Sequence, residues 1–388
     1  MYPSFYYIFR DLFGLELPFL DIIKTYGFFL ALSFLAAGLW LHYYFKKMEF
    51  QGIFTPDRIK TSRGGPIKVS EVFMNALFGF LLGYKTVYLI QHFQLHLDMA
   101  DILFTLQGSI VGGLIGALLF GVGFYLSHRS SATPEILRIE EDIYPHQRLT
   151  EMIMIAAFMG VLGSKIFASV EDWDNFIKDP MSSLLSFQGL TFYGGFIFAG
   201  IALVFYCRKR RMPFLHFLDA TAPALILAYG IGRLGCHFSG DGDWGIVNTL
   251  QRPGWIPSFL WASSYPGNVA MEGIPIPGCK GLYCKQLIPA VFPTPLYEFM
   301  MCVLIFLLLA RLSRSLRIPG LLFGIYLLFN GAERYLIEMI RINPDYNIGG
   351  SQLSQAQIIA LALIAMGIGL TSYLLIKKPD WHYASTQK

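Results

Sequence analysis

The chain has 388 residues, of which 54% are hydrophobic and only 14% are charged, and its formal net charge is +4. Soluble domains carry about 25% charged residues, so this composition excludes an ordinary soluble domain and indicates a membrane protein. The first 19 residues do not resemble a cleaved signal peptide, because Pro3, Pro18 and two acidic residues interrupt them.

Apolar segments of about 20 residues are long enough to cross a bilayer. The sequence therefore predicts an all-α polytopic membrane protein with about nine transmembrane helices. They are expected near residues 22–45, 72–91, 102–126, 151–169, 189–207, 217–235, 296–312, 319–339 and 356–376.

Basic residues cluster after alternate spans, as at Lys46 and Lys47 and in "CRKRR" (207–211). The loops after the second and fourth spans are poor in cations. Because cytoplasmic loops carry an excess of Lys and Arg, we expect the N-terminus outside and the C-terminus in the cytoplasm.

A two-helix unit is repeated in the first half of the chain. Residues 68–89 match residues 148–169 at an offset of 80, including a glutamate and a lysine in register. The expected divisions are an N-terminal segment (1–67), an extra duplicated unit (68–147) and a catalytic membrane core (148–388) with a long outer loop at about 237–294. Tyr193 in the second copy corresponds to Val111 in the first, so we expect the second copy to be the working one.

Two cysteines, Cys279 and Cys284, lie in that outer loop. An oxidising outer compartment makes a disulfide plausible, although the spacing fits two free thiols equally well. No second ligand pair has matching spacing, so no zinc site is expected.

The eighth span carries a polar stripe. An ionisable side chain at membrane depth costs roughly 2.5–3.5 kcal/mol, and residues four and seven apart share a helix face. Asn330, Arg334, Glu338 and Arg341 have this spacing. One glutamate among two arginines leaves about one positive charge, which predicts an anionic partner. The alternative is a helix end at the outer interface whose ion pairs are satisfied.

A second cluster lies in residues 218–245. Asp219 stands near the inner end of a span and Arg233 near its outer end, and a glycine-rich loop follows. Glycines let backbone N–H groups approach a phosphate closely. The loop and its entrance carry Cys236, His237, Asp241 and Asp243.

Two further motifs open predicted spans. In "FPTPLYEF" (292–299), Tyr297 and Glu298 follow prolines that suit a helix entrance; they could equally form an interfacial aromatic belt and a first-turn acid. In "TFYGGFIFAG" (191–200), Gly194 and Gly195 would admit close backbone or lipid contact.

With these motifs in order, the chain resembles the prolipoprotein diacylglyceryl transferases, bacterial inner-membrane enzymes that begin lipoprotein maturation. The resemblance is carried by "KTYGFF", "LTFYGGFIFAG", "GIGRLGCHFSGDGDWG", "FPTPLYE", "NGAERYLIEMIR" and "LSQAQ". It covers the first span and nearly everything from about 148 to 376.

The resemblance implies roles for particular residues. Arg233 and Arg334 match the family's two phosphate-binding arginines, and Glu338 and Arg341 match the polar partners that follow on the same helix. The remaining matches to residues that the family needs are Tyr26, Asp219, Gly245 and Glu298. We also expect Gly194, Gly195, His237, Asp241 and Asn330 to contact the substrate.

The implied reaction joins the thiol of a lipobox cysteine in a prolipoprotein signal peptide to the glyceryl carbon of phosphatidylglycerol. A thioether forms and glycerol phosphate leaves. This chain departs from the family at Tyr193, where the common pattern has a His that is often proposed as the base, and at Cys236, where it has Asn. Tyr193 is therefore expected to position a substrate group, and the thiol proton is left to Glu298, His237 or the leaving phosphate.

The expected location is the bacterial inner membrane, with the active site near the periplasmic leaflet. Neither a cofactor nor a nucleic-acid partner is expected. Competing readings are a lipid transporter or channel, which would also explain intramembrane charges, and a metal-dependent phosphatidyl transferase. Asp241, Asp243 and His237 would make only a weak metal site. Cys236 is not expected to form a covalent intermediate.

Overall fold

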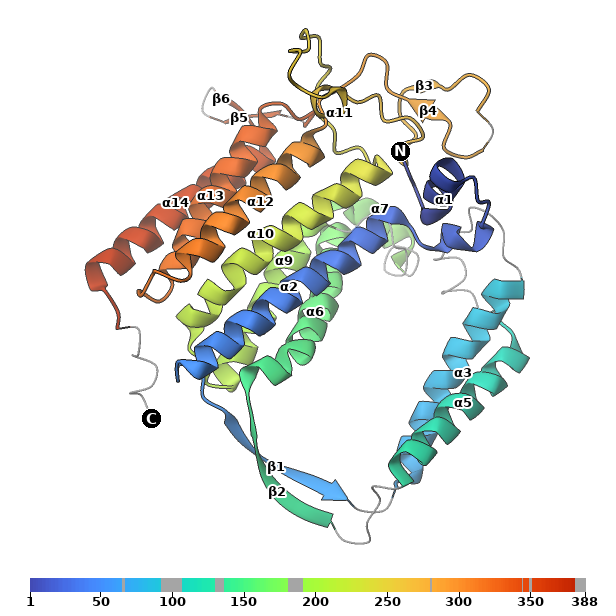
Figure 1. Ribbon diagram of the computed structural model, residues 1–388, viewed down its shortest axis with the longest axis vertical. Coiled ribbons are helices and arrows are strands. Elements are labelled where there is room, and N and C mark those ends of the chain that lie inside the picture. Colours follow the sequence, from blue (N-terminus) through green and yellow to red (C-terminus); the bar gives the residue numbers. More distant parts are fainter. Residues whose placement is uncertain are drawn as a thin grey trace. The chain divides into compact units, whose positions relative to one another are not determined.

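The protein is mostly helical (Figure 1). The computed structural model describes residues 1–64, 67–91, 107–129, 136–180, 191–279, 281–343, 345–348 and 351–380.

Seven helices of the described chain are long and apolar enough to cross a membrane. They are α2 (Thr25–Phe50), α3 (Val69–Gln91), α5 (Ile110–Arg129), α6 (Leu149–Glu171) extended by the short helix η2 (Pro145–Arg148), α10 (Phe214–Ser239), α12 (Thr294–Leu312) and α14 (Gln355–Lys377). The prediction of a multi-pass helical membrane protein is confirmed at this level. The other two expected spans correspond to α9 (Phe192–Lys209) and α13 (Leu321–Glu338), which have 18 residues each and are not among the seven.

Short elements connect or flank these helices. The helical ones are α1 (Phe5–Phe13), η1 (Pro18–Ile22), α7 (Trp173–Lys178) and α11 (Ser258–Trp261). The described residues also form three antiparallel two-stranded sheets, which were not expected from the sequence. They pair β1 (Asp57–Gly64) with β2 (Ile136–Ile143), β3 (Ile274–Pro275) with β4 (Lys285–Gln286), and β5 (Asp345–Ile348) with β6 (Ser351–Ser354).

By compactness the chain divides into two units. The first contains residues 1–55, 145–154 and 203–388, and the second contains residues 56–144 and 155–202. The two units reflect packing within the chain, whereas the divisions expected from the sequence reflect the repeat. The two sets of boundaries differ, and the divisions expected from the repeat remain a proposal.

The first unit is a helix bundle in which α10 packs against α2, α12 and α13, and α13 packs against α14 (Figure 1). Its core is apolar: Ile226 of α10, Leu309 of α12 and Leu322 of α13 are almost fully buried in one cluster. Many large apolar side chains elsewhere on these helices are exposed, as expected of helices that face lipid. The long loop with α11, β3 and β4 lies beyond the ends of α10 and α12 (Figure 1).

Local signals begin α14. Ser354 accepts a hydrogen bond from the Gln357 amide, and the Gln357 side chain accepts one from the Ser354 amide. This capping box satisfies two backbone donors that would otherwise be unpaired at the helix start.

Glycines bring helices close together in the second unit. A Cβ added to Gly83 of α3 would lie 2.2 Å from the carbonyl oxygen of Gly112 in α5. Likewise, a Cβ on Gly163 of α6 would lie 2.4 Å from the carbonyl oxygen of Gly194 in α9. Only glycine fits at such contacts, so both helix pairs depend on small residues for their packing.

Candidate active site

Glu298 is the centre of an ion-pair network in the first unit. It lies on α12, one turn after the Pro-rich entrance, and is fully buried. Its Oε2 is 3.0 Å from Nε of Arg233, and its Oε1 is 3.0 Å from Nη1 of Arg334. Since these arginines come from α10 and α13, two guanidinium groups from separate helices converge on one carboxylate.

Tyr229 supports this carboxylate from α10. Its hydroxyl donates a hydrogen bond of 3.0 Å to Oε1 of Glu298, and its ring centroid lies 4.9 Å from the guanidinium carbon of Arg233. Tyr229 was not among the site residues predicted from the sequence. The signal was available, because Tyr229 stands four residues before Arg233 and therefore on the same helix face.

Asp243 joins a third arginine to the network. Its carboxylate accepts hydrogen bonds from both Arg233 and Arg341, and Arg341 Nη1 also lies 3.6 Å from Glu298 Oε1. Burial alone would raise the pKa of Asp243, but the positive charges of the two arginines hold it below its ordinary value. The charged form of Asp243 is therefore the stable one.

Glu338 completes the network at the end of α13. Its Oε2 is 3.1 Å from Nη2 of Arg334, and its Oε1 accepts a hydrogen bond of 2.7 Å from the Ser354 hydroxyl. Asn330, which shares the predicted stripe, donates instead to the Tyr326 hydroxyl at 3.0 Å. Asn330 thus points to a neighbour on its own helix and not to the arginines.

The charges of this network balance. Arg233, Arg334 and Arg341 face three carboxylates. The surplus cation expected from α13 alone is wrong for the assembled site, because α12 contributes Glu298 and the loop contributes Asp243. Removing one partner of a buried ion pair costs about 3–5 kcal/mol, so the network tolerates its burial only when it is complete.

The glycine-rich loop reaches the network through a close backbone approach. Gly240 and Gly242 have positive φ angles of 67° and 105°, which favour glycine. Gly245 pairs with Arg341 in an isolated β-bridge, and its amide donates to the Phe292 carbonyl at 2.9 Å. These contacts hold Asp243 and Arg341 beside each other.

Replacing Gly245 with alanine is expected to disrupt this approach, because the added Cβ would lie 2.5 Å from the Ile340 carbonyl oxygen. Overpacking of this kind typically costs about 1–3 kcal/mol. We expect a lower thermal unfolding midpoint in detergent and a loss of enzymatic activity. Gly254→Ala is the matched control, since no atom lies within 4 Å of its added Cβ; equal behaviour of the two variants would contradict the packing role of Gly245.

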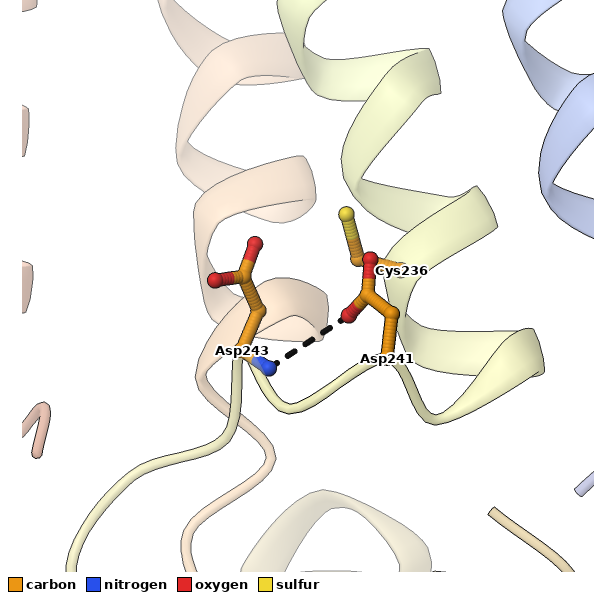
Figure 2. Close-up of side chains that lie close together, drawn as sticks. All are labelled: Cys236, Asp241 and Asp243. Atoms are coloured by element: carbon orange, nitrogen blue, oxygen red, sulfur yellow. Dashed lines mark hydrogen bonds between the residues drawn. The ribbon is translucent and has the colours of Figure 1, made fainter. Parts of the chain in front are cut away.

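Cys236, Asp241 and Asp243 place three ligand-type atoms within 4.8 Å of one another (Figure 2). Asp241 accepts a 3.4 Å hydrogen bond from the Asp243 amide, and its pKa is raised by burial and by the nearby Asp243 charge. Two guanidinium groups already balance Asp243 and would repel a cation. These residues therefore fit a metal ion poorly.

His237 and Tyr26 stand at the edge of the network. The His237 ring lies 3.1 Å from the Tyr265 hydroxyl, which fixes the outer loop to the end of α10. Tyr26 of α2 packs against Gly235, where an added Cβ would lie 3.3 Å from the tyrosine ring. Tyr26 therefore contacts α10 two residues after Arg233, whereas His237 contacts Tyr265 of the outer loop.

Asp219 is not part of the network, because it stands 14 residues before Arg233 on α10. Its carboxylate accepts hydrogen bonds from the amides of Gly320 and Phe323, at 2.7 and 2.9 Å. Since the first amides of a helix have no partner within it, Asp219 caps α13 from a neighbouring helix.

Removing the Asp219 carboxylate with Asp219→Ala is expected to lower the free energy of unfolding by about 1–2 kcal/mol, the usual value of a helix cap. Thermal unfolding in detergent measures this. Asp11→Ala is the control, because Asp11 is exposed and forms an ion pair with Arg10 at the surface. A large loss of activity in Asp219→Ala at an unchanged unfolding midpoint would contradict the capping role.

Tyr193, Gly194 and Gly195 open α9 in the second unit. Gly194 and Gly195 are buried against Gly163 and Gly160 of α6. The side chain of Tyr193 lies outside the described residues. The expected roles of these three residues in binding therefore stay predictions.

Cys279 and Cys284 form a disulfide with a sulfur–sulfur distance of 2.02 Å. It closes a short turn in the outer loop, next to β4.

The fold and the site define a multi-pass helical membrane protein that holds a balanced network of three arginines and three carboxylates in its bundle. A sequence model of the family described as prolipoprotein diacylglyceryl transferase matches residues 135–373. The chain belongs to this family of transferases.

Curated relatives agree with this assignment. A protein of Dehalococcoides mccartyi is 30% identical over 232 residues, which cover 58% of this chain and 77% of that protein. One from Clostridium tetani is 26% identical over 260 residues, covering 66% of this chain and 93% of that protein. One from Leptospira interrogans is 27% identical over 285 residues, covering 61% and 81%. All three are named phosphatidylglycerol–prolipoprotein diacylglyceryl transferase.

Proposed function

We propose that this protein transfers the diacylglyceryl group of phosphatidylglycerol to the lipobox cysteine of a prolipoprotein. The new bond is a thioether, and glycerol phosphate leaves. The observation that carries the proposal is the convergence of Arg233 and Arg334 on one buried carboxylate, Glu298. Family membership and the names of the relatives support the same reaction.

The arginines would bind the lipid phosphate. Guanidinium groups stay charged and can bind phosphate oxygens in pairs. The phosphodiester carries one negative charge and the leaving phosphomonoester approaches two, so fixed cations lower the barrier most where this charge develops. Glu298 holds both guanidinium groups in one place before the lipid arrives. Glu338 would hold Arg334 in place through its ion pair with that arginine, and Asp243 would hold Arg233 in the same way.

The thiol of the substrate must lose its proton, since only the thiolate attacks and a free thiol has a pKa of about 8.5. Of the acceptors expected from the sequence, Glu298 lies among the phosphate-binding arginines, whereas His237 contacts Tyr265. We therefore propose that Glu298 first accepts the thiol proton and that the leaving phosphate finally accepts it. Tyr193 would position the headgroup or the thiol by a hydrogen bond.

The proposed topology has nine transmembrane helices, with α9 and α13 added to the seven apolar ones. The positive-inside rule would place the N-terminus and the ion-pair network on the periplasmic side of the inner membrane. In the proposed duplication, the α3–α5 pair is an extra copy of the α6–α9 pair. The similar approaches of Gly83 to Gly112 and of Gly163 to Gly194 support a common origin.

The direct test combines purified protein in detergent, phosphatidylglycerol and a lipobox peptide, with mass spectrometry of the peptide. The expected result is a diacylglyceryl adduct on the cysteine, together with released glycerol phosphate. A lipid transporter would move phosphatidylglycerol between the leaflets of a vesicle without forming the adduct, and that outcome would overturn the proposal.

A further inference from the structure

Glu333 is a buried acid that the reaction described above does not use. It lies on α13 immediately before Arg334, and only 3% of it is exposed. Neither of its carboxylate oxygens has a hydrogen-bond partner in the described part of the chain. The three carboxylates of the ion-pair network, in contrast, each contact at least one arginine.

Charged and titratable groups from several elements interact electrostatically with Glu333. The titratable groups that face it come from α10, α12, α13 and the segment after α13. They are Tyr229, Arg233, Glu298, Cys302, Tyr326, Arg334 and Arg341. The arginines among them are already balanced by Glu298, Glu338 and Asp243, which leaves no cation for Glu333.

The charge count therefore distinguishes two states of the site. When Glu333 carries a proton, three arginines face three carboxylates and the network is neutral. When Glu333 loses that proton, the network has one net negative charge, and a buried ion without a partner is costly. The lack of a hydrogen-bond partner for either oxygen in the described part of the chain favours the first state, because an unpartnered ion costs more to bury than a neutral carboxyl group.

Building on the proposed function, we propose that Glu333 couples the binding of the anionic lipid phosphate to its own proton. The protonated side chain leaves the arginines free to exchange a carboxylate for the phosphate. The ionised side chain adds a negative charge close to Glu298 and opposes the incoming phosphate. Affinity for the lipid is therefore full at low pH and is lost as the pH rises through the ionisation of Glu333.

Binding of a short-chain phosphatidylglycerol to the purified full-length protein in nonionic detergent tests this inference, measured from about pH 7 to about pH 10, because documented buried glutamates ionise at about pH 8–9. Over this range we expect the affinity of the unmodified protein to fall about tenfold, which corresponds to about 1.4 kcal/mol. Glu333→Gln has nearly the same shape but cannot ionise, so its affinity at neutral pH should be retained and should fall less than about threefold. Glu333→Met provides a second uncharged variant in case the amide disturbs folding.

Three further arms make the result specific. Thr371→Val removes another buried oxygen that lacks a partner, so it should behave like the unmodified protein. Glycerol phosphate shows whether the headgroup alone carries the effect, and short-chain phosphatidylcholine shows whether net charge is needed. Curves of the same slope in the unmodified protein and in both uncharged variants would overturn the inference, as would loss of neutral-pH binding in both variants. Adduct formation assayed in the same samples at neutral pH tests the proposed function separately.

Discussion

Replacing Arg334 with alanine is expected to lower the rate of diacylglyceryl transfer by about a hundred- to a thousandfold, the usual effect of losing one preorganised charge donor. Arg334 contacts both Glu298 and Glu338 at about 3 Å. Without it, the developing charge of the leaving phosphate loses one of its two fixed cations. The measurement is the initial rate of adduct formation on a lipobox peptide.

One further variant separates charge from geometry at position 334, and one at another arginine serves as the control. Arg334→Lys keeps the positive charge but cannot bind phosphate in a planar, two-point manner, so its rate should lie between those of Arg334→Ala and the unmodified protein. Arg311→Ala removes an exposed arginine from the last turn of α12 and should leave the rate unchanged. A normal transfer rate in folded Arg334→Ala would show that this guanidinium group does not act on the phosphate.

Glu298→Gln is expected to have the second large effect, on stability as well as on rate. The amide keeps the shape of the side chain but removes the negative charge that faces Arg233, Arg334 and Arg341. Leaving buried cations without their partner costs about 3–5 kcal/mol. We expect a clear drop in the thermal unfolding midpoint and a loss of transfer of at least about a hundredfold.

The control for Glu298→Gln is Glu71→Gln, which makes the same chemical change at an exposed position in the first turn of α3. Glu71→Gln should change neither the unfolding midpoint nor the transfer rate. Glu298→Gln could instead unfold at the temperature of the unmodified protein and transfer lipid at a normal rate. The negative charge of Glu298 would then contribute neither to stability nor to transfer.

The sequence predicted the helical part of the fold well, because long apolar segments have few alternatives in a bilayer. The family resemblance paired Arg233 with Arg334, and both of these arginines contact Glu298 in the structure. The strand pairs were missed for two reasons. The two-residue strands β3 and β4 leave no periodic pattern, and the eight-residue strands β1 and β2 lie between predicted spans, where only loops were expected.

The net charge of the ion-pair network was not predicted correctly from the sequence. Counting charges along α13 alone gave a surplus cation, whereas Asp243 from the loop and Glu298 from α12 remove it. Periodicity describes one helix at a time, so it cannot show which side chains other elements bring to the same place. Asp219, which the family resemblance assigned to the site, accepts hydrogen bonds from the amides at the start of α13, so its expected role in binding stays a prediction.

A structure of the protein with bound phosphatidylglycerol would test the central claim most directly. The expected result is that oxygens of one lipid phosphate lie within hydrogen-bond distance of the guanidinium groups of both Arg233 and Arg334. A phosphate bound elsewhere in the bundle, with both arginines still closed on Glu298, would contradict it.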